Sequence, residues 1–380
     1  MAKSVLSQGL NEKTPQGGPA GLLKDFHIDW PLFTGLIALS TLGLVILYSA
    51  SGENWAIVTR QMIWMIIAFT IMLIAAQIPP HLIQLWTPWV FIAGLLFLVM
   101  VLFFGEMGKG AQRWLDLGFF RFQPSEMMKF AVPMMVAWFI AEKTLPPSWG
   151  RIFGALLLIL IPVALIARQP DLGTSILVGS AGIFVLLFAG ISWYLIGGFA
   201  LILAAAAPIV WFYYMHDYQR QRVLTFLNPE SDPLGSGYHI IQSKIAIGSG
   251  GLYGKGWLNG TQSQLDFLPE RSTDFIFAVY SEEFGIVGVL CLLALYLYIV
   301  IRGLVIAYQA QTTFTRVLAG SLVLTFMVYI VVNIGMVSGL LPVVGVPLPL
   351  VSYGGTSMVT LMIAFGILMS IQTHRKLLTS

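Results

Sequence analysis

Long apolar runs follow one another through almost the whole chain, and they limit what it can fold into. We expect membrane-spanning helices near residues 31–51, 55–77, 87–105, 125–142, 151–168, 174–190, 193–215, 275–301, 316–340 and 356–372. Each run is long enough to cross a bilayer core of about 30 Å as a helix. The sequence therefore predicts an all-α polytopic membrane protein with about ten transmembrane helices.

The composition supports a membrane protein. Hydrophobic residues make up 57% of the chain and charged residues only 10%, whereas soluble domains carry about 25% charged residues. This difference excludes a soluble enzyme and a disordered chain. A net charge of +3 predicts no nucleic-acid partner. The single cysteine, Cys291, excludes an internal disulfide, and the scattered histidines predict no metal centre.

Residues 1–25 are polar and contain no apolar signal-peptide core, so we expect a disordered cytoplasmic tail before one membrane domain, residues 26–380. An even number of spans places both termini on one side, and the distribution of lysine and arginine favours the cytoplasm. The hydrophilic segment 216–273 then forms a large extracytoplasmic loop between the seventh and eighth helices. Residues 238–247 predict a short interfacial helix within it, ended by glycines that either approach an anion or form a flexible connector.

Asp274 stands directly before the apolar start of the eighth predicted helix. It is either the N-cap of that helix or a carboxylate held at the membrane surface as a general base. Glu282 and Glu283 follow about 12–14 Å further along a straight helix. Because carboxylates are costly in lipid unless they face protein or water, we expect this helix to border a polar cavity.

Glu126 and Lys129 share one face of the fourth predicted helix. The pair either stabilises the helix or belongs to a functional site, and its position inside a membrane span favours the second interpretation. Further cations on the outer side either anchor the protein to lipid headgroups or bind a phosphate group. They are Lys109, Arg113, Arg121, Arg168, Arg220 and Arg222.

The stretch from Leu341 to Ser357 is apolar, yet its prolines and glycines are incompatible with a regular helix. Irregular backbone at membrane depth must be buried in protein or line a cavity. The sequence therefore predicts a re-entrant Pro/Gly segment before the tenth helix. A plain interhelical loop is the alternative.

The residues from Asn333 to Ser357 resemble the C-terminal signature of the SEDS family (shape, elongation, division and sporulation). The runs Gly250–Trp257 and Phe267–Phe277 resemble the elongation branch of this family more than its division branch. The resemblance extends from about residue 30 to the C-terminus and includes the number of spans.

The resemblance implies a peptidoglycan glycosyltransferase of the bacterial inner membrane, which polymerises lipid II into glycan strands during cell elongation. Asp274 matches the essential aspartate of the family. The predicted substrate-binding residues are Arg121, Gln123, Glu126, Lys129, Asp171, Arg222 and Lys244. The implied partners are lipid II, the growing lipid-linked glycan, membrane lipids, a class B penicillin-binding protein and the elongation machinery.

We expect an inverting transfer, in which Asp274 removes the proton from a sugar 4-hydroxyl. Arg121, Lys129, Arg222 and Lys244 are the candidates to stabilise the departing undecaprenyl diphosphate. A divalent cation such as Mg²⁺ or Mn²⁺ can bridge a diphosphate and a carboxylate, but the sequence requires no cofactor. The alternatives are a lipid II flippase or transporter, the division paralogue, and a non-catalytic membrane scaffold.

Overall fold

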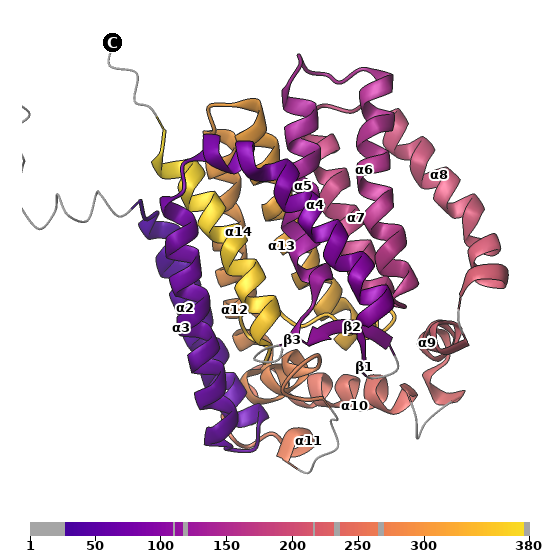
Figure 1. Ribbon diagram of the computed structural model, residues 1–380. Helices are drawn as coiled ribbons and strands as arrows, with labels where there is room; N and C mark the ends of the chain where they lie inside the picture. The colour runs from indigo at the N-terminus through magenta and orange to yellow at the C-terminus, as the bar shows by residue number, and fades with distance from the viewer. Residues whose placement is uncertain are drawn as a thin grey trace, which may run out of the picture.

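The computed structural model describes residues 27–108, 111–116, 121–215, 217–231, 236–264 and 270–375. These residues form a bundle of long helices, with short strands and short helices gathered at one end, which we call the loop side (Figure 1). The predicted disordered tail, residues 1–25, lies outside the described residues.

A helix occupies each of the predicted apolar ranges. The helices are α2 (Trp30–Ala50), α3 (Trp55–Gln77), α4 (Pro80–Phe104), α5 (Pro124–Ala141), α6 (Trp149–Arg168), α7 (Leu172–Phe188), α8 (Trp193–Ile209), α12 (Ile276–Tyr308), α13 (Thr313–Val337) and α14 (Gly355–Thr373). Within the described ranges, 7 helices are long and apolar enough to cross a membrane. The other three, α5, α7 and α8, have 17 or 18 residues. The prediction of a mainly helical protein with many membrane spans is confirmed.

Proline accounts for one difference from the expected bounds. α4 begins at Pro80 rather than at residue 87, because a proline is well suited to the first turn of a helix. A second proline, Pro88, lies inside the helix.

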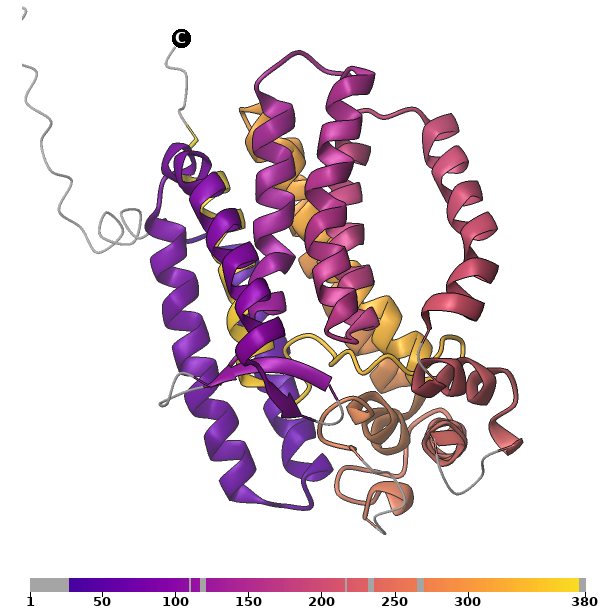
Figure 2. The ribbon, with the colours of Figure 1, turned by 45° about the vertical axis from the view of Figure 1, so that its right-hand side comes forward.

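α13 lies at the centre of the bundle (Figure 1). It packs against α5, α7 and α12, and its residues Leu318, Phe326 and Tyr329 are buried. α14 packs chiefly against α3, whereas α8 stands at one edge of the bundle (Figure 2). Polar groups on α13 must therefore find their partners on neighbouring elements.

The two ends of the described chain lie side by side, opposite the loop side. The rings of His27 and His374 stack with their centroids 3.9 Å apart. Asp29 caps α2 by accepting a hydrogen bond from the Leu32 amide at 3.0 Å, and it binds Arg302 of α12 at 3.0 and 2.5 Å. An even number of spans predicts this shared side.

Two groups of short elements cover the loop side. Strands β1 (Glu106–Gly108), β2 (Ala111–Asp116) and β3 (Arg121–Phe122) form an antiparallel sheet in that order. The segment between α8 and α12 contains η1 (Val210–Tyr214), α9 (Asp217–Leu227), η2 (Pro229–Ser231), α10 (Ser236–Ser249) and α11 (Thr261–Gln264). α10 covers the helix predicted at 238–247 and ends at Ser249, directly before Gly250 and Gly251. The all-α prediction missed the strands, because runs this short carry little periodic signal.

α12 is bent, which corrects the expectation of one straight helix after Asp274. The backbone at Gly285 is not helical, with φ 62° and ψ −164°. The helix begins at Ile276, and its N-cap residue is Phe275, so Asp274 is not the N-cap. The bend turns Glu282 and Glu283 toward other protein elements instead of leaving them along a straight membrane span.

The loop after α10 fills the bend. The amides of Lys255 and Gly256 donate to the carbonyl oxygens of Glu282 and Glu283 at 3.0 and 2.9 Å. The Glu282 carboxylate accepts bonds from Lys255, Thr261 and the Gln262 amide at 2.7, 3.0 and 3.0 Å, whereas Ser49 of α2 donates to Glu283. The glycines permit this contact, because a Cβ at Gly254 would lie 2.1 Å from the Glu283 oxygen. The glycines of this loop therefore allow its backbone to pack closely against the backbone of α12.

We predict that Gly285→Ala destabilises the protein. An added Cβ would lie 2.4 Å from the Gly254 nitrogen, and the backbone conformation, which is nearly exclusive to glycine, costs other residues about 1–3 kcal/mol. Gly248→Ala is the matched control, since no atom lies within 4 Å of its added Cβ. Thermal unfolding in detergent should occur at a lower temperature for Gly285→Ala alone. An unchanged melting temperature for that variant would contradict the bend.

Candidate active site

The segment between α13 and α14, residues 338–354, is irregular, and its second half is buried. We call it the Pro/Gly segment. The backbone at Gly339, Gly345 and Leu350 has positive φ angles of 72°, 75° and 61°. Val346, Leu348 and Val351 are buried, so the second half of the segment runs through the interior of the protein. Its polar backbone groups must therefore be satisfied by other parts of the protein.

Asp274 lies in a turn that is bound to this segment. Ser352 Oγ donates to the carbonyl oxygen of Thr273 at 2.6 Å, and the Tyr353 amide donates to the carbonyl oxygen of Ser272 at 2.9 Å. The Asp274 carboxylate lies against Gly345, where an added Cβ would be 3.4 Å from Oδ2. The side chain is neither fully buried nor fully exposed. The geometry is that of a carboxylate at the edge of a packed segment.

Asn333 of α13 binds the same turn from the other direction. Its Nδ2 donates to the Asp274 carbonyl oxygen at 3.0 Å and to the Val346 carbonyl oxygen at 2.7 Å. Asn333 was expected only as part of the family signature, and these two hydrogen bonds were not predicted. Nothing in a local pattern could reveal it, because the Asp274 carbonyl is 59 positions away along the chain.

Two cations predicted to bind substrate reach the Pro/Gly segment from the loop side. Lys244 of α10 lies against Gly339, where an added Cβ would be 2.2 Å from Cε and 2.8 Å from Nζ. Arg222 of α9 donates to the Val343 carbonyl oxygen at 3.2 Å. Both side chains are exposed. The segment therefore brings Asp274, Lys244 and Arg222 to one region of the protein.

Asp171 is the N-cap of α7, and other protein groups surround its carboxylate. It accepts bonds from the amide and the hydroxyl of Thr174 at 3.2 and 3.0 Å. Gln123 donates to it at 3.3 Å, and Arg113 lies 3.7 Å away. The next residues of α7 contact the Pro/Gly segment, because a Cβ at Gly173 would lie 3.1 Å from the Val344 oxygen. Asp171 and Gln123 thus come together at the start of α7.

Arg121 belongs to strand β3, where it pairs with Asp116 in the register of the sheet. The position of its side chain lies outside what the structure describes. Its strand ends shortly before Gln123, the N-cap residue of α5.

Glu126 and Lys129 form a buried ion pair on α5. The two side chains are 2.5 Å apart, and each residue is only 7% exposed. Lys129 Nζ also lies 4.9 Å from the centroid of the Tyr329 ring on α13. Glu126 Oε2 is buried and has no hydrogen-bond partner among the described residues. The structure thus makes this pair part of the bundle interior rather than of an exposed helix face.

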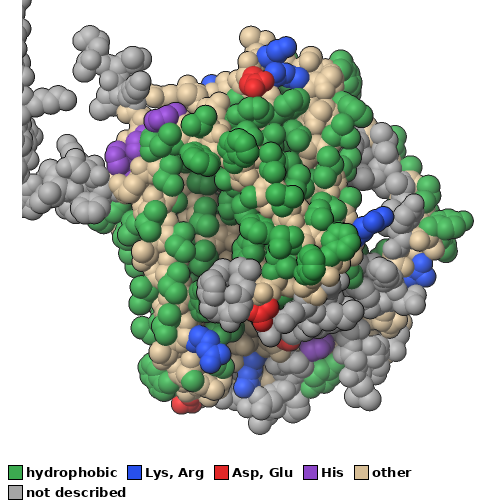
Figure 3. Space-filling view, in the orientation of Figure 1, with side chains coloured by type: hydrophobic (Ala, Val, Ile, Leu, Met, Phe, Trp, Pro, Cys, Tyr) green, Lys and Arg blue, Asp and Glu red, His purple; other side chains and the backbone are tan. Residues whose placement is uncertain are grey.

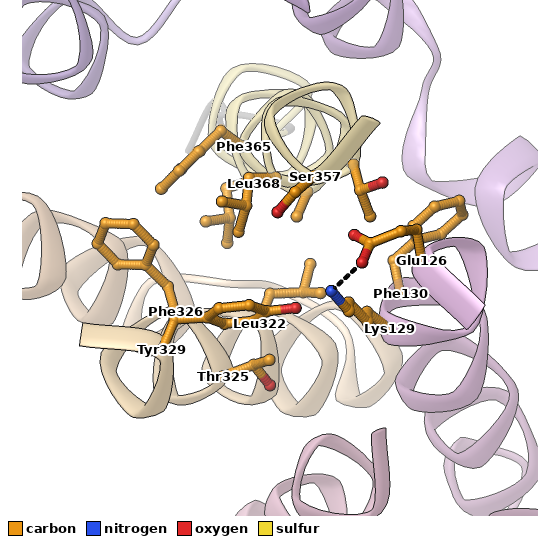
Figure 4. A pocket seen from close by; sticks show the side chains of 13 residues that line it. Glu126, Lys129, Phe130, Leu322, Thr325, Phe326, Tyr329, Ser357, Phe365 and Leu368 are labelled. Carbon is orange, nitrogen blue, oxygen red and sulfur yellow. Dashed lines mark hydrogen bonds and ion pairs between the residues drawn. The ribbon is translucent and has the colours of Figure 1, made fainter. Parts of the chain in front are cut away.

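This ion pair stands at the edge of a cavity between α5, α13 and α14 (Figure 4). The cavity holds about 420 Å³ of space, its open mouth included. Around the pair it is lined by the polar residues Thr325, Tyr329, Ser357 and Thr360, and elsewhere mainly by apolar side chains. They include Phe130, Leu322, Phe326, Leu361, Phe365 and Leu368.

Tyr329 connects the cavity to the Pro/Gly segment. Its buried ring packs in one cluster with Val346 and Leu177, and it contacts Lys129 on the cavity side. Asn333 follows Tyr329 by one helical turn on the same face of α13. The Asp274 turn and the Glu126–Lys129 cavity are therefore built on neighbouring turns of one central helix.

Comparison with known proteins identifies the family. The family model of the FtsW, RodA and SpoVE cell cycle proteins matches residues 27–377. The chain belongs to this family. It is 59% identical over 353 residues to the peptidoglycan glycosyltransferase MrdB of Escherichia coli K12, covering 93% of this chain and 95% of that protein. A probable FtsW of Geobacter metallireducens is 36% identical over 354 residues, covering 90% and 93%.

Solved structures show the same fold. A chain from a structure on the coordination of polymerization and crosslinking by a peptidoglycan synthase complex matches with a TM-score of 0.79 and 32% identity, covering 92% of this chain and 99% of that chain. The rod shape-determining protein RodA of Thermus thermophilus matches with a TM-score of 0.69 and 27% identity, covering 92% and 98%. The predicted resemblance to the SEDS family, and to its elongation branch, is confirmed.

We predict that removing one member of the buried ion pair costs more stability than removing both. Glu126→Gln or Lys129→Met alone leaves an uncompensated buried charge, which costs about 3–5 kcal/mol. The double variant leaves no charge and should recover much of that loss. Chemical unfolding of the three variants in detergent measures the coupling. Losses that simply add would contradict a coupled pair.

Proposed function

We propose that the protein is a peptidoglycan glycosyltransferase that polymerises lipid II into glycan strands during cell elongation. The names of the 59% identical MrdB and of the RodA structure support this activity. The observation that carries the proposal is the position of Asp274, held at the Pro/Gly segment to which Arg222 and Lys244 also extend. A base and two cations in one region suit the transfer of a sugar from a lipid diphosphate.

In the proposed reaction, Asp274 takes the proton of the 4-hydroxyl of the acceptor lipid II. The freed oxygen attacks the anomeric carbon of the lipid-linked donor glycan from the face opposite the diphosphate. A glycosidic bond forms, the bond to the diphosphate oxygen breaks, and undecaprenyl diphosphate leaves with the negative charge. Only one carboxylate is required, because the configuration inverts in a single displacement.

Arg222 and Lys244 are the best-placed groups to stabilise that leaving group. Both are exposed cations at the Pro/Gly segment, and cations placed where charge develops stabilise a transition state. Lys129 differs from them, because its charge is balanced by Glu126 at 2.5 Å. We propose that the Glu126–Lys129 pair shapes the polar edge of the cavity and contacts a neutral part of the bound lipid. Arg121 remains a candidate for the diphosphate from the family resemblance.

The contacts of Asp171 and Gln123 support a less direct part in substrate binding. The Asp171 carboxylate is already bonded to Thr174 and Gln123. We propose that these two residues hold the start of α7 against Val344, and so maintain the shape of the Pro/Gly segment. Direct contact with substrate would require the loss of these bonds.

The proposed proton transfer to Asp274 does not require a divalent cation. We propose that Mg²⁺ or Mn²⁺ binds together with the substrate diphosphate, because such ions are usually held by substrate phosphates and only one or two carboxylates.

We propose that the protein crosses the inner membrane ten times as one domain, residues 26–380. Both termini then lie in the cytoplasm and the loop side lies in the periplasm. Hydrophobic side chains cover the middle of the face in Figure 3, and charged side chains lie mainly toward its two ends. The Pro/Gly segment is then a re-entrant segment between the last two spans. We propose that the reaction takes place at the outer edge of the bilayer, where the lipid diphosphates lie.

We propose a class B penicillin-binding protein as the partner, within the elongation machinery. The support is the matching chain from a structure that describes polymerization and crosslinking by one synthase complex. Crosslinking would be the activity of the partner, because the proposed site accounts for polymerisation only.

We predict that Asp274→Asn loses polymerisation. The amide cannot accept the hydroxyl proton, and loss of a general base costs about 10²- to 10⁴-fold in rate. The assay follows glycan products made from lipid II by the purified full chain with its transpeptidase partner. Glu230→Gln, an exposed carboxylate variant on the same side, should keep the wild-type rate. Polymerisation by Asp274→Asn at that rate would refute the proposed function, and lipid II translocation in liposomes without polymerisation would favour a flippase.

A further inference from the structure

The carbonyl oxygen of Asp274 has an unusual partner. Asp274 precedes α12, whose first backbone bond runs from the Ala278 amide to the Phe275 oxygen at 3.0 Å. The bond from Asn333 Nδ2 at 3.0 Å ties this carbonyl to the centre of the bundle. The same nitrogen donates at 2.7 Å to Val346, the residue after Gly345. One amide group therefore links two irregular stretches of backbone.

The two linked carbonyls lie on either side of the contact between the Asp274 carboxylate and Gly345. One belongs to Asp274 itself, and the other follows Gly345, against which the carboxylate packs. Asn333 is fully buried, so it can take only one arrangement. It thus links the backbone of Asp274 to the backbone of Val346 in the Pro/Gly segment.

The other bonds of the turn are placed differently. Ser352 and Tyr353 hold the carbonyls of Thr273 and Ser272, and both belong to the far end of the Pro/Gly segment. Without Asn333 the turn would stay attached at Thr273, at Ser272 and through the Phe275 amide, which donates to the Glu270 oxygen at 3.3 Å, but the Asp274 carbonyl would lose its bond to α13. Loss of Asn333 should therefore displace the carboxylate without releasing the turn.

Asparagine is the side chain that fits this task. Its NH₂ group has two donors on one atom, and both are used here. Turning the amide over would place its oxygen against two carbonyl oxygens, so the orientation is determined by the surroundings. Asn333 Oδ1 is buried and has no hydrogen-bond partner among the described residues. The two donor bonds therefore account for all the hydrogen bonds that its amide makes there.

We infer that Asn333 is a positioning residue, which holds the Asp274 carboxylate at its distance from Gly345 through two bonds from one nitrogen. This inference rests on the proposed function of Asp274 as the general base. A residue with this task contributes to kcat and not to substrate binding, since it touches no part of the substrate.

The test uses the full chain with its transpeptidase partner and measures initial rates over a range of lipid II concentrations. We expect Asn333→Ala to lower kcat by up to about 100-fold, the effect of a misplacement of about 1 Å, with KM unchanged. Ser321→Ala is the matched control. Ser321 is also fully buried on α13 and donates at 2.6 Å to the carbonyl oxygen of Ala181. The Ser321→Ala variant should lower the melting temperature by about as much as Asn333→Ala does and leave kcat unchanged.

Asn333→Asp adds a second measurement, the pH dependence of activity, which would not change if Asn333 only stabilised the fold. The side chain keeps its shape, but a carboxylate faces two carbonyl oxygens and donates no hydrogen. Protonation restores one donor. We therefore expect the ratio of Asn333→Asp activity to wild-type activity to rise as the pH is lowered.

Three outcomes would overturn the inference: an unchanged kcat in Asn333→Ala, an equal loss of kcat in Ser321→Ala, or a ratio for Asn333→Asp that does not depend on pH. Asp274→Asn is assayed in parallel, so that a wrong positioning role for Asn333 can be distinguished from a wrong proposed function. If Asp274→Asn is inactive and Asn333→Ala is fully active, only the positioning role is wrong. If Asp274→Asn is fully active, the general base itself is wrong.

Discussion

The hydrogen bonds of the buried Pro/Gly segment are the constraint on which the site depends. The irregular backbone of this stretch makes few bonds of its own, such as that of the Ser352 amide to the Leu348 oxygen at 3.0 Å, and apolar surroundings do not allow the remaining groups to stay unpaired. Side chains supply further partners, both from other elements and from the segment itself. Asn333 binds Val346, Tyr296 donates to the Pro349 oxygen at 2.7 Å, and the Ser352 hydroxyl accepts from the Leu348 amide at 2.8 Å. Asn333 and Ser352 also bind the turn that contains Asp274.

The same constraint explains why distant elements share one site. α13 is central and offers Tyr329 to the cavity and Asn333 to the Asp274 turn. The bend at Gly285 allows the loop that follows α10 to pack against α12, and α10 in turn presents Lys244 to the Pro/Gly segment. The proposed base, Asp274, is thus held on irregular backbone that is bonded to the central helix α13.

Sequence patterns predicted the parts of the structure that depend on local periodicity and composition. The apolar ranges, α10 and the irregular backbone between α13 and α14 all have such local signals. Asp274 was singled out because it directly precedes an apolar helix and matches an aspartate of the family, and the Glu126–Lys129 pair because charge is rare in apolar helices. The bend at Gly285, the partners of Glu282 and the bonds of Asn333 were not predicted. They depend on contacts between residues that are distant in the sequence. Such contacts have no local pattern in a single sequence.

The most direct test is a structure of the Asp274→Asn variant with its partner and bound lipid II, a complex that should hold substrate without turning it over. The account predicts the acceptor 4-hydroxyl oxygen within about 2.6–3.2 Å of the side chain at position 274. It also predicts the donor diphosphate beside Arg222 and Lys244. A sugar bound away from the Pro/Gly segment, or a side chain at position 274 that faces only hydrocarbon, would contradict it.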